Sequence, residues 1–131
     1  MRRRLFVFWA AMAVGRAQAP NITGEWSTGA GGRYAVVENF GQQRITIVPG
    51  TASDPKGVGW LERAGTGESL RGEVVIGGCW CRLELTESAD GSSLVGSLRM
   101  DMKKSSRRCR ASLTKEAKNG GASPFALTRR L

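Results

Sequence analysis

Histidine is absent from this chain of 131 residues. Since histidine is the commonest general base near neutral pH and the commonest metal ligand, its absence excludes Ser-His-Asp and Cys-His catalytic arrangements. Carboxylate pairs could replace it. However, Glu84, Glu87 and Asp90 fall at outward or turn positions of the strand pattern described below, where no two face each other across a cleft. We therefore expect neither enzymatic activity nor a cofactor.

The sequence also lacks an apolar run long enough for a membrane helix at its N-terminus. The run Leu5–Val14 has ten residues, about half of what a bilayer requires. It follows the basic segment Met1–Arg4 and precedes the small residues around Ala17 and Ala19, which is the layout of a secretory signal. We predict that residues 1–19 are a signal peptide cleaved after Ala17 or Ala19, that the protein is secreted to an extracellular or periplasmic space, and that it has no transmembrane span. The alternative for this segment is a short buried N-terminal helix.

Removal of that segment changes the charge balance. The chain has 20 Lys and Arg residues against 11 Asp and Glu residues, a net charge of +9. The first nineteen residues contain four arginines and no acid, so 16 basic residues remain and the net charge becomes +5. This value is ordinary for a soluble domain. Because the remaining basic residues have few aromatic residues among them, we do not expect a nucleic-acid partner.

Short alternating apolar runs, separated by turns rich in Gly, Asp or Ser, extend from Gly24 to Leu113. Alternation with period two places one face of a strand in a core and the other in water, and short connections make sequence neighbours pair in space. We predict an all-β domain over residues 20–115, an eight-stranded antiparallel up-and-down barrel with a sandwich as the alternative, followed by a flexible C-terminal tail over residues 116–131. The predicted strands are Ile22–Ser27, Arg33–Phe40, Arg44–Val48, Val58–Arg63, Ser69–Ile76, Cys79–Thr86, Ser93–Met102 and Arg107–Thr114.

The alternation assigns a face to each residue. On the fourth predicted strand it places Val58 and Trp60 inward. Glu38 and Glu62 also fall at inward positions, which conflicts with the cost of burying an unpaired carboxylate. A bulge or a place at the barrel rim would keep both carboxylates near water.

Two stretches resemble known secreted barrels. The segment Ile22-Thr23-Gly24-Glu25-Trp26, a Gly-x-Trp on the first strand, resembles the opening of the calycin barrels, the lipocalins and avidins. The segment from Cys81 to Leu98, an apolar strand, an Asp-Gly turn and a Leu-x-Gly strand, resembles the repeated hairpin of small lipocalin-like barrels. The resemblance implies an eight-stranded barrel in which Trp26 closes one end of the core, often with a small apolar ligand inside.

The first functional hypothesis is a binding module for a small apolar ligand held between the strands. Such a module requires a cavity on the order of a few hundred cubic ångströms. The inward side chains that would contact the ligand are Trp26, Tyr34, Trp60, Leu98 and Met100.

The alternative is an interaction protein with a filled barrel. Its candidate site is the densest cluster of charge in the sequence, Lys103-Lys104-Ser-Ser-Arg107-Arg108-Cys-Arg110, which we expect at a hairpin tip. A cluster of five cations is suited to an acidic glycan, an anionic lipid surface or an acidic protein partner.

The cysteines are few and odd in number: Cys79, Cys81 and Cys109. In an oxidising compartment they predict one disulfide, from Cys109 to either Cys79 or Cys81. The predicted strand register argues against it, since it puts the Cα atoms of Cys79 and Cys109 about 9–10 Å apart, beyond the roughly 4.4–6.8 Å of a disulfide. Buried free thiols are the other interpretation. We expect no metal site, because three thiolates without histidine are an unusual ligand set for a protein of this kind.

One modification motif is present. Asn21-Ile22-Thr23 is an acceptor sequon, so in a eukaryotic host Asn21 is a predicted N-glycosylation site.

Overall fold

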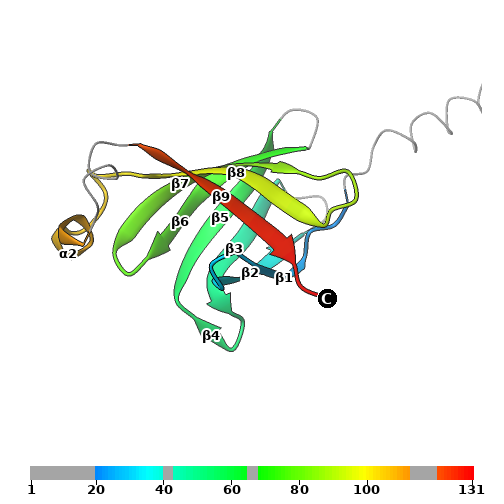
Figure 1. The fold of residues 1–131 in the computed structure, drawn as a ribbon, viewed down its shortest axis with the longest axis horizontal. Coiled ribbons are helices and arrows are strands. Elements are labelled where there is room, and N and C mark those ends of the chain that lie inside the picture. Colours follow the sequence, from blue (N-terminus) through cyan, green and yellow to red (C-terminus); the bar gives the residue numbers. More distant parts are fainter. Residues whose placement is uncertain (1–19, 40–42, 65–67, 113–120) are drawn as a thin grey trace, which may run out of the picture.

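The computed structural model describes residues 20–39, 43–64, 68–112 and 121–131. The predicted signal peptide therefore lies outside the described residues, as do Phe40 and the end of the last predicted strand. The described elements form an all-β fold with one short helix (Figure 1). They are β1 (Gly24–Ser27), β2 (Arg33–Glu38), β3 (Arg44–Thr51), β4 (Asp54–Pro55), β5 (Gly57–Ala64), β6 (Ser69–Ile76), β7 (Cys79–Glu87), β8 (Ser93–Met100), α2 (Arg107–Ala111) and β9 (Ala122–Arg129).

The strands close into a barrel. Each long strand pairs antiparallel with the next one along the chain, and β9 pairs with both β8 and β1, where Arg129 lies opposite Trp26. The two-residue strand β4 pairs with the end of β3, and β3 continues the barrel through its pairing with β5. The eight-stranded antiparallel up-and-down barrel predicted from the sequence is thus confirmed.

The identity of the eighth strand was predicted wrongly. The segment Arg107–Ala111, expected in a strand, forms the helix α2. Ser106 precedes it in an extended conformation, and its hydroxyl accepts a hydrogen bond from the Cys109 amide at 3.2 Å. A serine in this position caps a helix by satisfying an amide that has no partner within the helix.

The last barrel strand comes instead from the segment predicted to be a flexible tail. In β9, Phe125, Leu127 and Arg129 alternate with exposed residues, and Leu127 is fully buried. A short strand with one fully buried residue gives a weak sequence signal. Its place is decided by the open edges of β1 and β8, whose backbone groups need partners.

The face of β5 is the reverse of the predicted one. Leu61 is fully buried between Ile45 and Gly72 of the neighbouring strands, whereas Val58 is 59% exposed. Trp60 and Glu62 consequently lie on the outer face. A change of one residue in strand phase moves every side chain to the other face, and it removes the conflict over Glu62, which is exposed to water.

Glu38 points inward as predicted, and it is paired there. At one end of the barrel, the Arg63 guanidinium binds both Glu38 and Glu87. The nitrogen–oxygen distance is 2.6 Å to each carboxylate. The second oxygen of Glu38 accepts the Ile22 amide at 2.9 Å. Burial opposes the charge of Arg63, but the hydrogen bonds that it donates to Glu87 and Glu38 outweigh this effect and raise the pKa of the guanidinium. Glu87, expected at an outward or turn position, is therefore an inward residue with a side chain only 2% exposed.

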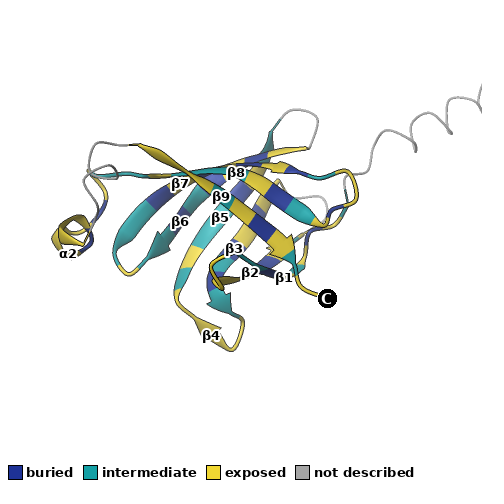
Figure 2. Cartoon of the chain, viewed as in Figure 1, coloured by how far each residue is buried: buried dark blue, intermediate teal, exposed yellow. Residues whose placement is uncertain are grey.

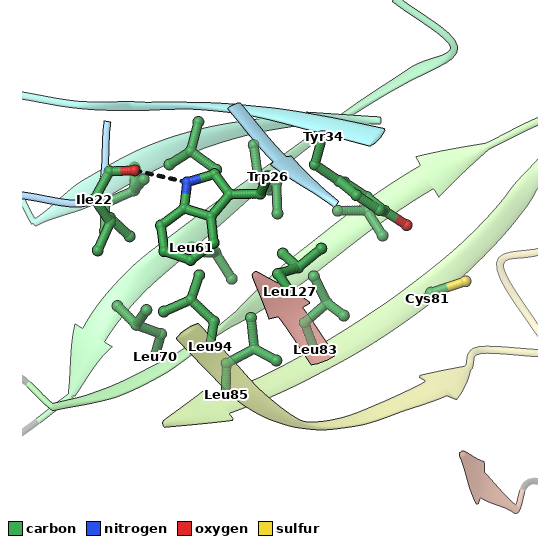
Figure 3. Packing of buried hydrophobic residues seen from close by; sticks show 14 residues of the cluster. Ile22, Trp26, Tyr34, Leu61, Leu70, Cys81, Leu83, Leu85, Leu94 and Leu127 are labelled. Carbon is green, nitrogen blue, oxygen red and sulfur yellow. Dashed lines mark hydrogen bonds between the residues drawn. The ribbon is translucent and has the colours of Figure 1, made fainter. Parts of the chain in front are cut away.

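The same end of the barrel is closed by Trp26. Its indole is fully buried, and its ring nitrogen donates a hydrogen bond to the Ile22 carbonyl at 3.0 Å (Figure 3). The indole forms one buried cluster with side chains from the other seven barrel strands. Along β7, buried and exposed residues alternate (Figure 2). The buried residues of this apolar cluster are Ile22, Trp26, Tyr34, Val36, Ile45, Ile47, Leu61, Leu70, Val74, Cys81, Leu83, Leu85, Leu94 and Leu127.

Two strand glycines allow the sheet to bend into this barrel. A Cβ atom at Gly72 would overlap the carbonyl oxygen of Trp60, and one at Gly96 would overlap the carbonyl oxygen of Glu84. Any larger residue would force adjacent strands apart, so both positions require glycine for the close approach of two backbones.

Candidate functional site

The candidate site lies where the chain leaves β8 and continues into α2 (Figure 1). We call residues 103–110 the basic segment. It begins in a turn around Asp101, whose carboxylate accepts the amides of Lys103 and Lys104 at 3.1 and 3.2 Å. The hydroxyl of Ser105, a buried residue, donates to the Asp101 carbonyl and accepts the Trp80 amide. The turn is therefore joined to β7 by hydrogen bonds and is not a free loop.

Two further links hold α2 against the turn between β6 and β7. The Ser106 amide donates to the Gly78 carbonyl at 2.9 Å. Cys109, the one buried residue of α2, forms a disulfide with Cys79 at the start of β7. The Cα atoms of the two cysteines are 5.2 Å apart. The helix explains why this distance is shorter than the strand register predicted: α2 turns back over the end of β7 instead of lying two strands away.

The disulfide selects one of the predicted pairings. Cys79 is the partner of Cys109, and Cys81 is a buried free thiol. Burial raises the pKa of the Cys81 thiol, so it is protonated at neutral pH.

All five predicted anion-binding residues are exposed: Lys103, Lys104, Arg107, Arg108 and Arg110. Lys104 is partly neutralised, since its amine lies 3.6 Å from a carboxylate oxygen of Glu73 and over the Trp80 ring. Among the described residues, the other four cations belong to no ion pair. The first turn of α2 contains no acidic residue either. The structure thus brings together four solvent-facing cations in one short, anchored segment.

The predicted ligand-binding residues are not brought together in the same way. Trp60 lies on the outer face, where Arg44 stacks over its ring at 4.3 Å, so it cannot line an interior cavity with the others. Trp26 is fully buried at the closed end, and its ring nitrogen is already hydrogen-bonded. Tyr34, Leu98 and Met100 do share the interior near the basic segment, with Tyr34 packed edge-on against Phe125. Burial, and to a lesser extent Cys81, raises the pKa of the Tyr34 phenol, which keeps it neutral.

Two hollows of the described surface lie outside the barrel. They have volumes of about 440 and 250 Å³ and meet at Arg71 and Glu84, over the bends at Gly96 and Gly72. Their lining mixes outward polar side chains such as Arg71 and Glu84 with apolar residues such as Trp60, whereas small-molecule sites are lined predominantly by apolar side chains. They offer no support for an apolar ligand.

Asn21 lies just before β1 and is exposed, as glycosylation of its side chain requires. Its side-chain oxygen accepts the Thr23 amide at 2.9 Å. Glycosylation at this position stays a prediction.

Comparisons with known proteins assign neither a family nor a function to the chain. No protein-family model matches the chain, and no curated protein or solved structure matches it either. Within the described ranges, no helix has the length and apolar character needed to cross a bilayer.

Proposed function

We propose that this protein is a non-enzymatic interaction protein, and that its filled barrel presents the basic segment to a polyanion. The observation that supports this most directly is the set of four exposed cations without ion-pair partners, Lys103, Arg107, Arg108 and Arg110, on a segment anchored by the Cys79–Cys109 disulfide. Cations held in place lose less conformational freedom on binding than cations on a flexible tail, so more of the electrostatic attraction contributes to affinity.

The composition of the segment favours an acidic glycan over a lipid surface. Proteins that bind membranes in this way combine cations with apolar side chains that insert among the lipids. The exposed large apolar residues of the described chain are Val37, Val58, Val95 and Leu131, and none belongs to the basic segment. A hydrated polymer of sulfate or carboxylate groups requires no such insertion.

The test is elution from a sulfated-glycan column in a salt gradient. The triple variant Arg107→Ser, Arg108→Ser, Arg110→Ser should elute at clearly lower salt than the unmodified protein. The matched control, Arg44→Ser, Arg71→Ser, Arg130→Ser, loses the same charge from exposed positions elsewhere and should elute between the two. Binding should also vanish near 1 M salt, where the screening length falls to about 3 Å. Equal elution of both triple variants would mean that net charge alone is responsible and would reject the proposal.

A second arm separates glycan from lipid. Vesicles of phosphatidylserine mixed with phosphatidylcholine should bind the protein more weakly than the sulfated glycan does at the same salt concentration. Tighter binding to the vesicles would overturn the glycan assignment.

The second candidate is the apolar-ligand module. It is favoured by the half-buried apolar residues Leu98, Met100 and Phe125, which pack against the buried cluster that contains Tyr34. A fluorescent apolar probe should then bind with one site per chain, and Leu98→Trp should reduce that binding by filling the space.

We also propose that the protein is secreted and related to the lipocalin-like barrels. Secretion is supported by the signal-like segment of residues 1–19 together with the disulfide. The relationship is supported by the Gly24-x-Trp26 opening and by the barrel topology. Detection of a mature chain that begins at Gln18 or Pro20 would test the first proposal.

A further inference from the structure

Four sulfur atoms gather at the barrel end that carries the basic segment. Cys79 and Cys81 are two residues apart on β7 and point to the same side, and Met100 of β8 lies directly opposite Cys81. The Met100 sulfur is 3.6 Å from the Cys109 sulfur and 3.9 Å from the Cys81 sulfur. Cys109 is in turn bonded to Cys79. The cluster therefore draws its members from three elements, β7, β8 and α2.

The two distances from the Met100 sulfur match those of a metal–sulfur site, and opening the disulfide would let the Cys79 and Cys109 sulfurs separate to a similar distance. Four sulfurs placed tetrahedrally about 2.3 Å from a central ion lie about 3.8 Å from one another. Thiolate and thioether ligands are soft donors, which favour Cu(I) over the hard ions Mg(II) and Ca(II). The thioether also favours Cu(I) over Zn(II), whose usual protein ligands are thiolate, imidazole and carboxylate. The thioether of Met100 joins the cysteines only through the register of β7 and β8, which the sequence pattern does not reveal.

We propose that the reduced protein binds one Cu(I) ion through Cys79, Cys81, Cys109 and Met100. In the disulfide-bonded form, the described residues include no group of three histidine, cysteine, aspartate or glutamate side chains able to hold a metal. A thiol reductant must therefore first open the Cys79–Cys109 bond. Two reductant thiols supply two electrons and two protons, leaving two protein thiols and one reductant disulfide. Cu(I) then replaces the thiol protons, which pass to solvent.

The metal would take over the structural role of the disulfide. Cys109 is the residue that ties α2 to the barrel. A Cu(I) ion shared by β7, β8 and α2 would hold the basic segment in place under reducing conditions, where a disulfide cannot. The inference does not depend on the proposed glycan binding, because it concerns the inner side of the segment.

The experiment is an anaerobic titration of the protein with Cu(I) against a coloured Cu(I) chelator. The disulfide is first reduced with a phosphine, which takes up the oxygen of one water molecule as two thiols form. We expect one Cu(I) per reduced chain and much weaker binding by the unreduced protein. X-ray absorption should show only sulfur neighbours, at about 2.3 Å.

Variants distinguish this site from nonspecific thiol binding. Cys81→Ser should weaken Cu(I) binding by more than the roughly 10- to 100-fold that the loss of an outer-shell partner causes. Met100→Leu should weaken it less. Met102→Leu is the matched control, since Met102 has no contact with these sulfurs among the described contacts, and it should leave the affinity unchanged.

Three results would overturn the proposal. They are an unchanged affinity in Cys81→Ser, equal losses in Met100→Leu and Met102→Leu, and a nitrogen or oxygen shell around the metal. Circular dichroism of the reduced protein, with and without Cu(I), shows whether it remains folded. If reduction abolishes the strand signal and Cu(I) does not restore it, the site does not form and the proposal fails.

Discussion

The guanidinium of Arg129 lies 4.7 Å from the centre of the Trp26 ring, so the last barrel strand covers the indole supplied by the first. Arg129 also donates hydrogen bonds to the carbonyls of Asn21, Thr23 and Gly91, at 2.7, 2.9 and 3.1 Å. One side chain thus joins the two ends of the barrel chain and the turn before β8.

This arrangement predicts a large effect of Arg129→Ala. The variant loses a cation–π contact, worth about 0.5–2 kcal/mol, and hydrogen bonds from a charged donor, worth about 1.5–3 kcal/mol. The free energy of unfolding in urea should fall by about 2–4 kcal/mol. The neighbouring Arg130→Ala, at an exposed position, should change it by less than about 0.5 kcal/mol. Similar values for the two variants would contradict the role of Arg129.

Arg63 is expected to be equally sensitive. Arg63→Met leaves the carboxylates of Glu38 and Glu87 buried without their cation, which costs about 3–5 kcal/mol in comparable buried pairs. Arg63→Lys should restore only part of the loss, because an ammonium group cannot reach both carboxylates with the planar geometry of a guanidinium. Thermal unfolding of the two variants measures this, and full recovery in Arg63→Lys would show that charge alone matters.

The reversed face of β5 can be tested by two neighbouring substitutions. Leu61→Ala opens a cavity in the core and should reduce the free energy of unfolding by about 2–5 kcal/mol. Trp60→Ala removes the larger side chain, but from the outer face, and should reduce it by about 1 kcal/mol or less. If the order of the two losses were reversed in urea titrations, the predicted phase of the strand would be correct after all.

The disulfide is expected to stabilise both the fold and the basic segment. Its cysteines are separated by 30 residues, and closing a loop of that length contributes about 3–4 kcal/mol. The double variant Cys79→Ser, Cys109→Ser should lose that amount, and its amides in residues 103–112 should exchange faster with deuterium. Cys81→Ala, which keeps the disulfide, is the control and should leave that exchange unchanged.

The Asp90 turn before β8 predicts a pH dependence. Hydrogen bonds from the Ser92 hydroxyl and amide, and from the Ser88 hydroxyl, lower the pKa of the Asp90 carboxyl from 3.8 to about 2. Because the pKa is lower in the folded state, the carboxylate stabilises the fold above about pH 4, and this contribution is lost as the pH falls toward 2. Carboxyl-carbon NMR should place its midpoint near 2. Replacing both Ser88 and Ser92 with alanine should return the midpoint toward 3.8.

The pattern of the sequence was sufficient where each strand had a continuous apolar side. Leu83, Leu85 and Cys81 alternate with charged residues, and this alone placed β7 and its inward face correctly. Seven of the eight barrel strands followed from such patterns and from short turns. The pattern failed on β5, where Val58 and Trp60 carry more apolar surface than Gly59 and Leu61. The local sequence therefore favours the face that the structure turns outward.

The sequence by itself determined an antiparallel barrel, its inward residues on most strands, and a cluster of cations between Lys103 and Arg110. Only the tertiary structure decided that β9 completes the barrel, that Cys79 is the partner of Cys109, and that Met100 joins the cysteines. The reason is physical: alternation and turn chemistry act over a few residues, whereas strand closure and sulfur pairing depend on contacts between segments far apart in the chain.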